Sequence, residues 1–182
     1  MEDTGPTFDP EARIRRSNRK SRAQLKLEER ESLEKILNSR DDENLNLEVK
    51  FCSVKGRGIV TKKPFSKGEY LVEYRGELLD IKTAKNMETL YAKDPSKGSY
   101  MYYFNSKGKK MCVDATEETG RYGRLINHSR KSANCITKVV LFQNNPRLII
   151  VAKRDLVTGT ELLFDYNDRC QKSMLALPWL SS

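Results

Sequence analysis

From Leu47 onward the chain consists of short apolar segments separated by turns that contain glycine, asparagine or proline. Short runs rich in valine, isoleucine, tyrosine and phenylalanine favour β-strands, and closely spaced turns leave little room for helices between them. We therefore expect one β-rich α+β domain built from small sheets. The predicted strands are 47–51, 59–63, 69–79, 99–104, 109–115, 136–142, 147–155 and 161–166, with hairpin turns at 105–108 and 143–146.

Helices are expected on both sides of this β-rich region and once within it. The first covers about residues 20–40, because Ser21 can cap it, with Gln24 three residues later as in a capping box. A second helix is expected at residues 81–94. The predicted division of the chain is a disordered basic arm at 1–18, an N-flanking helix at 19–44, the β-rich domain at 45–168 and a C-terminal helix at 169–182.

The chain carries 34 lysine and arginine residues against 25 aspartate and glutamate residues, a net charge of +9. Six of the residues 13–22 are basic, and such an arm suits contacts with the phosphates of DNA. A solubilising basic surface explains the same composition, so charge alone leaves both interpretations open. The sequence shows no secretory signal and no apolar run long enough to span a membrane. We therefore expect a cytosolic or nuclear protein.

The four cysteines lie far apart and form no closely spaced pair. Structural zinc sites usually draw on closely spaced cysteines, so we expect no metal centre. Reduced thiols also agree with a cytosolic or nuclear location. The cysteines are Cys52, Cys112, Cys135 and Cys170.

The only histidine, His128, lies in the sequence RLINHS at residues 124–129. A lone histidine can act as a general base because its pKa lies near neutral pH, it can bind zinc, or it can be a packed core residue. A cysteine–histidine nucleophile would need one of the cysteines beside it. The motifs around His128 are therefore needed to choose between these roles.

Four motifs follow one another along the chain: KGRG at 55–58, EYRG at 73–76, RLINHS at 124–129 and ELLFDY at 161–166. In this order they resemble the SET domain of protein lysine methyltransferases. The stretches RKSRAQLKLEERE, YAKDPSKGSYMYYF, CVDAT and ALPWL are similar to the histone H4 lysine-20 monomethyltransferase (PR-Set7) group within that family. The resemblance covers about residues 47–180 and implies short β-sheets, a knotted-loop active site and a C-terminal helix that closes the site.

This resemblance implies that S-adenosylmethionine (SAM) binds on one face and a substrate lysine on the other, with a narrow channel between them. Tyr74 and Tyr166 would line the channel, with the Tyr166 hydroxyl beside the transferring methyl. His128 would position the cofactor, although a histidine that packs the loop predicts nearly the same geometry. The cofactor-binding residues implied by the family are Lys55, Gly56, Arg57, Tyr100, Asn127, His128 and Trp179.

One position departs from the most similar group. Phe164 stands where the monomethylating enzymes carry a tyrosine whose hydroxyl holds a water, so we expect methylation beyond the first methyl, at least to dimethyl-lysine. Asp168 and Glu88 are acidic candidates for binding the arginines of a histone tail, and ordinary solvated carboxylates explain them equally well.

The resemblance also implies partners and a location. The expected partners are the histone H4 tail and the nucleosome, with DNA bound by the basic arm, and the expected enzyme is a monomer of the nucleus and chromosome. Two alternatives are a SET-like module that binds nucleosomes without catalysis and a basic nucleic-acid module whose aromatic residues stack bases.

Overall fold

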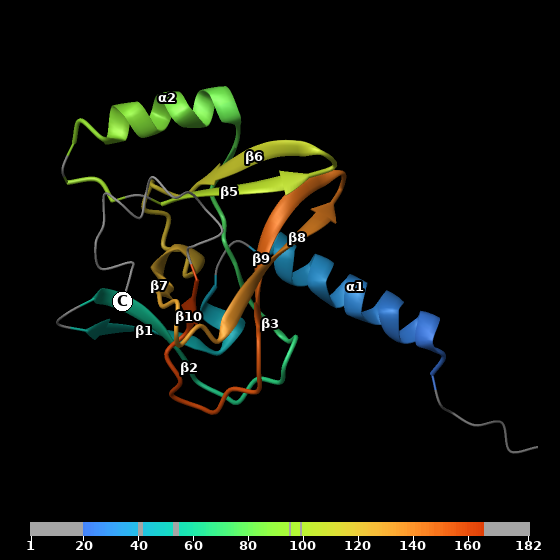
Figure 1. Cartoon of the computed structure of the whole chain (residues 1–182). Helices are drawn as coiled ribbons and strands as arrows, with labels where there is room; N and C mark the ends of the chain where they lie inside the picture. The colour runs from blue at the N-terminus through green and yellow to red at the C-terminus, as the bar shows by residue number, and fades with distance from the viewer. Residues whose placement is uncertain (1–19, 40–41, 53–54, 95, 99, 166–182) are drawn as a thin grey trace, which may run out of the picture.

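The computed structural model describes residues 20–39, 42–52, 55–94, 96–98 and 100–165 (Figure 1). Within these residues the strands form four small sheets, two of them with three strands and two with two strands. A long helix extends away from this β-rich body, and a second helix covers one of the sheets (Figure 1). The prediction of a β-rich α+β fold built from short sheets is therefore confirmed.

The first sheet is an antiparallel hairpin of β1 (Leu47–Cys52) and β2 (Gly56–Thr61). The strand predicted at 59–63 begins three residues earlier, at Gly56, so that within the KGRG motif only Lys55 lies in the turn. Gly56 has φ of +73°, a conformation that glycine adopts without a steric penalty. This glycine lets the chain turn sharply and continue directly as a strand.

The prediction of one strand over residues 69–79 is wrong. The segment divides into β3 (Tyr70–Glu73) and β4 (Glu77–Asp80), which belong to different sheets. The change of direction occurs at Gly76, where a Cβ atom would lie only 2.1 Å from the carbonyl oxygen of Asp114. The backbones approach so closely that only glycine fits, and the apolar pattern of the segment carries no sign of this contact.

Both predicted hairpins are confirmed. The turn at Lys107 and Gly108 joins β5 (Met101–Ser106) to β6 (Lys109–Asp114), and both turn residues have positive φ. The second hairpin joins β8 (Cys135–Phe142) to β9 (Asn145–Ala152). The strand orders are β4-β6-β5 in one three-stranded sheet and β3-β9-β8 in the other.

The two α-helices begin at side-chain caps. In α1 (Arg22–Asn38) the Ser21 side chain accepts from the Gln24 backbone amide, as the capping box predicted. The short 3-10 helix η1 (Glu43–Leu45) follows α1. In α2 (Ile81–Tyr91) the Asp80 carboxylate accepts from the Thr83 amide, and the helix packs against the β4-β6-β5 sheet (Figure 1).

The body of the protein shares one apolar core, and α1 docks on a smaller one. Leu37 of α1 is buried against Ile149 and Val151 of β9. The proposed arm at 1–18 and the C-terminal helix at 169–182 lie outside the described residues. Among the residues that are described, no helix is both long and apolar enough to cross a membrane.

The predicted strand 161–166 is shorter than expected. It contains β10 (Leu163–Phe164), which pairs in parallel with β7 (Asn127–His128), while Glu161 forms a bridge with Val60 of β2. The Leu163 amide also donates to the side chain of Asn134. The side chain of Asn134 and the two-residue strand β7 thus flank β10. Backbone pairing of β10 therefore stops after two residues, unlike the longer ladder of an ordinary hairpin.

Candidate active site

Three segments that are distant in sequence converge around the side chain of Asn127. Its Nδ2 atom donates to the carbonyl oxygen of Arg57 at 3.3 Å and to Oε1 of Glu161 at 3.1 Å. A Cβ on Gly58 would lie 2.8 Å from the same Nδ2 atom. The KGRG, RLINHS and ELLFDY motifs therefore meet at one point, between β2, β7 and the segment that enters β10.

Pairs of opposite charges surround this point. Lys55 Nζ lies 3.5 Å from Oε2 of Glu161, and Arg57 Nη2 lies 2.6 Å from Oε2 of Glu118. The hydrogen bond between Arg57 and Glu118 lowers the pKa of the carboxyl and raises the pKa of the guanidinium. All four side chains are about a third to a half exposed. Such exposed pairs are weak and can be exchanged for ligand contacts.

A buried arginine joins this region to Tyr100. Arg124 donates from Nε to the carbonyl oxygen of Ala115 at 2.7 Å and from Nη1 to Glu118 Oε2 at 2.5 Å. Its guanidinium lies 3.9 Å from the centroid of the Tyr100 ring, within the range of a cation–π contact. Arg124 thereby holds the segment after β6 and the ring of Tyr100 together.

Aromatic side chains form a row on the other side of Tyr100. The Tyr74 hydroxyl donates to the carbonyl oxygen of Tyr100 at 2.8 Å. The ring centroids of Tyr74 and Tyr102 lie 5.4 Å apart, and those of Tyr102 and Phe164 lie 6.5 Å apart. Tyr74, Tyr102 and Phe164 are all buried. Tyr100 therefore stands between the charged residues around Asn127 and an apolar aromatic row.

His128 lies in β7, where it is paired in register with Phe164. Its side chain is buried, and Nδ1 lies 3.9 Å from Oδ1 of Asp165. Cys135 is a poor candidate for a nucleophile, because burial raises the pKa of its thiol to about 12, and the thiolate is the reactive form. Among the described residues, no group of three or more metal-ligating side chains is found.

A family model described as the SET domain matches residues 56–167. The chain belongs to the SET-domain family. The match begins within the KGRG motif and ends just after ELLFDY, so it contains all the segments that meet around Asn127 and Tyr100.

Curated relatives extend the similarity over most of the chain. The N-lysine methyltransferase KMT5A-A of Danio rerio is 50% identical over 167 residues, which are 92% of this chain and 48% of the relative. The histone-lysine N-methyltransferase Set8 of Drosophila melanogaster is 46% identical over 169 residues, 92% of this chain and 24% of the relative. The histone-lysine N-methyltransferase set-1 of Caenorhabditis elegans is 46% identical, over 92% of this chain and 69% of the relative.

The chain thus spans about half the length of the Danio rerio relative. A solved structure is also similar: the crystal structure of CpSET8 from Cryptosporidium matches with a TM-score of 0.64 and 45% identity, over 68% of this chain and 58% of that chain. The similarity to the histone H4 lysine-20 group expected from the sequence is therefore confirmed, because these relatives carry the KMT5A and Set8 names.

The SET-domain structure places the predicted residues in two neighbouring groups. Around the charged residues near Asn127 lie Lys55, Gly56, Arg57, Tyr100, Asn127 and His128, and in the aromatic row lie Tyr74 and Phe164. Glu88 is half-buried on α2, and α2 lies apart from β7 (Figure 1). Tyr166, Asp168 and Trp179 lie outside the described residues, so the structure does not locate them.

Some of the residues that surround Asn127 and Tyr100 could not be found from the sequence. Glu118 and Glu161 are charged partners of Arg57 and Lys55, from which they are separated by 61 and 106 residues. Arg124 and Glu161 belong to the quoted motifs, but nothing in the motifs indicates their partners. Tyr102 lies in the quoted stretch YAKDPSKGSYMYYF, but tyrosine is a residue type that β-strands commonly contain, so the stretch does not single it out.

Proposed function

We propose that this chain is a SAM-dependent protein-lysine N-methyltransferase that acts on the histone H4 tail at lysine-20. The observation that carries the proposal is the junction at Tyr100, whose ring contacts Arg124 beside the charged residues and whose carbonyl oxygen accepts from the Tyr74 hydroxyl. A site for a charged cofactor and an apolar channel for a side chain thereby share one residue. Names of the relatives support the same activity.

The charged residues around Asn127 fit SAM, which carries a carboxylate, an ammonium group and a positively charged sulfur. Lys55 and Arg57 supply cations for the carboxylate, while Glu118 and Glu161 supply negative charge. Glycine at position 58 lets the Asn127 amide pack against β2, since a Cβ there would lie 2.8 Å from Asn127 Nδ2. We expect Asn127 and His128 to hold the nucleoside and amino-acid portions, with Trp179 covering the adenine.

When bound, SAM would supply an electrophilic methyl group, to which the lysine nitrogen bonds as the bond from that carbon to sulfur breaks and the neutral thioether leaves. The nitrogen must be neutral, and a free lysine has a pKa of about 10.4, so neutralising it at pH 7 costs about 4–5 kcal/mol. An apolar environment lowers that pKa by disfavouring the charged form. The buried rings of Tyr74, Tyr102 and Phe164 provide such an environment. We expect alignment of the nitrogen in this channel to supply most of the rate.

The decisive experiment offers labelled SAM together with nucleosomes, free histone H4 or other histones. We expect label to appear on H4, and SAM alone to raise the unfolding temperature of the protein because it binds the folded state. A thermal shift without transfer to any histone would favour a binding module. Label on another histone and none on H4 would contradict the proposed substrate.

Phe164 is expected to set the number of methyl groups added. It is buried and stacked 6.5 Å from Tyr102, and it has no hydroxyl that could anchor a water against the amine. We predict dimethylated product from the wild-type protein and a shift to monomethylated product in Phe164→Tyr, measured by mass spectrometry of an H4 peptide. Phe142→Tyr, a substitution at the end of β8, is the control and should leave the product unchanged. Strictly monomethylated product in both the wild type and Phe164→Tyr would contradict this prediction.

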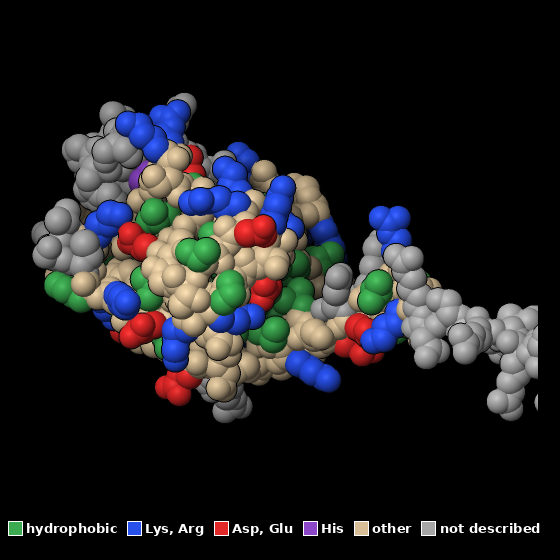
Figure 2. All heavy atoms as spheres, turned by 90° about the horizontal axis from the view of Figure 1, so that it is seen from below, with side chains coloured by type: hydrophobic (Ala, Val, Ile, Leu, Met, Phe, Trp, Pro, Cys, Tyr) green, Lys and Arg blue, Asp and Glu red, His purple; other side chains and the backbone are tan. Residues whose placement is uncertain are grey.

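The excess of basic side chains on the surface favours a polyanionic partner. Lysine and arginine side chains outnumber acidic ones on the face shown in Figure 2, in keeping with the net charge of +9. We propose that DNA is bound through this charge and through the arm at 1–18, and that Glu88 and Asp168 receive arginines of the histone tail. Such a role places the protein in the nucleus, on chromosomes.

A further inference from the structure

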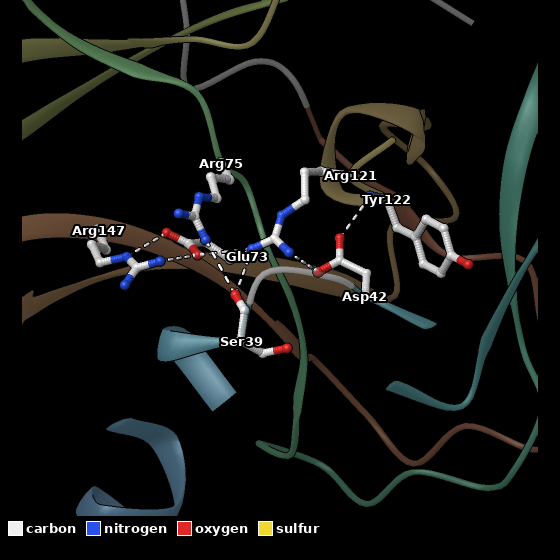
Figure 3. A network of polar contacts seen from close by, with 7 residues as sticks. All are labelled: Ser39, Asp42, Glu73, Arg75, Arg121, Tyr122 and Arg147. Atoms are coloured by element: carbon white, nitrogen blue, oxygen red, sulfur yellow. Dashed lines mark hydrogen bonds and ion pairs between the residues drawn. The ribbon is translucent and has the colours of Figure 1, made fainter. Parts of the chain in front are cut away.

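A network of buried charges joins the segment after α1 to the strand that precedes Tyr74 (Figure 3). At its centre is Glu73, the last residue of β3. Arg147 of β9 donates from Nε to Glu73 Oε1 at 2.6 Å and from Nη2 to Oε2 at 2.5 Å. This two-point contact fixes both the position and the plane of the carboxylate.

Arg121 extends the network toward the N-flanking segment. Its Nη2 atom lies 4.0 Å from Glu73 Oε2, and its Nη1 atom lies 3.2 Å from Oδ1 of Asp42. Nη2 also donates to the carbonyl oxygen of Ser39 at 3.4 Å. The side chains of Arg121, Asp42 and Glu73 are each less than a tenth exposed. Removal of the charge on Asp42 would therefore leave Arg121 buried with incomplete compensation.

Asp42 also holds the backbone that lies against Tyr74. Its Oδ2 atom accepts from the Tyr122 amide at 2.8 Å. The next residue, Gly123, packs so closely that a Cβ would lie 2.2 Å from the carbonyl oxygen of Glu73 and 2.9 Å from the Cα of Tyr74. Asp42 thus contacts Arg121, which lies beside the Glu73 carboxylate, and Tyr122, whose neighbour Gly123 packs against the Glu73–Tyr74 backbone.

We propose that Asp42 and Arg121 are positioning residues that hold Tyr74 in the channel, so that docking of the segment after α1 sets the rate of methyl transfer. This inference rests on the proposed function. The backbone amide of Tyr74 donates to the carbonyl oxygen of Leu148 at 2.8 Å, and its hydroxyl donates to that of Tyr100. The charged network contacts Glu73, the residue before Tyr74. A displacement of Glu73 therefore tilts the Tyr74 ring relative to the substrate amine.

Loss of the charged network should disturb the cofactor-binding residues less than the channel residues. Asn127 is held by Glu161 and by the pairing of β7 with β10, and these contacts do not involve Asp42. Loss of the network should therefore lower kcat while the affinity for SAM is nearly unchanged. A merely structural role would lower stability and leave kcat of the folded protein intact.

The test variant is Asp42→Asn, assayed at a temperature at which every variant remains folded. The amide oxygen can still accept from Tyr122, but the negative charge beside Arg121 is lost. We expect kcat to fall by about tenfold or more and the Kd for SAM to change by less than about twofold. Asp42→Glu, which restores the charge, should recover part of kcat. Unchanged kcat in Asp42→Asn would overturn the proposal.

Two controls separate positioning from general destabilisation. Leu156→Val weakens the core at a buried residue, and Glu69→Gln breaks the exposed pair with Lys63. Both should leave kcat within about twofold of the wild type. A double-mutant cycle with Tyr74→Phe adds a direct measure of coupling. The effect of Asp42→Asn should shrink in the Tyr74→Phe background, and strictly additive effects would overturn the proposal.

Amide hydrogen exchange provides a readout that does not depend on catalysis. Asp42→Asn should speed exchange in peptides that cover residues 70–76 and 121–125 more than Leu156→Val does. Unchanged exchange rates in these peptides would contradict the proposed coupling between Asp42 and Tyr74. If the wild-type protein transferred no methyl group to any histone, the proposed function would fail, while the exchange measurement would still decide whether Asp42 holds Tyr74.

Discussion

Gly76→Ala should destabilise the protein by about 3 kcal/mol or more, because backbone must move to admit the new methyl group. The Cβ would lie 2.1 Å from the carbonyl oxygen and 2.5 Å from the carbonyl carbon of Asp114. Neither atom belongs to a flexible side chain that could rotate away. Separation of β3 from β4 relies on this contact, so the substitution strains both three-stranded sheets. Urea unfolding followed by circular dichroism measures the loss.

Gly108→Ala is the matched control for this prediction. Gly108 has φ of +75° in the β5–β6 turn, and a Cβ there would meet no atom within 4 Å. Its cost should be limited to backbone strain, about 1–2 kcal/mol. If both substitutions lowered the free energy of unfolding equally, close packing at Gly76 would not explain the effect and the prediction would be contradicted.

Tyr166→Phe should reduce methyl transfer by about a hundredfold or more, the size of effect that follows removal of one hydrogen-bonding group aimed at a transition state. The family resemblance implies that the Tyr166 hydroxyl lies beside the transferring methyl and orients the amine. The Kd for SAM should change by less than about threefold, because this contact matters mainly in the transition state. Initial rates with labelled SAM and isothermal titration measure the two quantities.

Tyr70→Phe is the control for loss of a tyrosine hydroxyl elsewhere. Tyr70 begins β3 and packs with the small core under α1, and burial raises the pKa of its hydroxyl. We expect its kcat to stay within about threefold of the wild type. Full activity in Tyr166→Phe would contradict the assigned role of Tyr166.

The local parts of the fold were predictable because they depend on neighbouring residues. Ser21 and Gln24 indicated the start of α1, and the capping contact is present. The two hairpin turns were recognisable from glycine, asparagine and proline, and both hairpins form. The order of the four motifs was sufficient to indicate the SET family. Each of these features depends on a few adjacent residues or on the order of the motifs along the chain.

The errors arose where distant backbone decided the outcome. The apolar pattern of residues 69–79 suits one long strand, but the approach of Asp114 to Gly76 divides it. The segment 161–166 suits an ordinary strand, but β7 and the side chain of Asn134 occupy its edges and leave β10 with two residues. Tertiary contacts overrode local propensity at both places.

The sequence by itself therefore determined the family, the hairpins and the residue types of the proposed methyl-transfer site. The tertiary structure alone brought Glu118 to Arg57 across 61 residues and Tyr122 to Asp42 across 80 residues. Periodicity and turn chemistry record interactions between near neighbours, whereas pairing of buried charges depends on how separate sheets and segments pack. Hence the sequence indicated Tyr74, and only the fold revealed the charges that hold it.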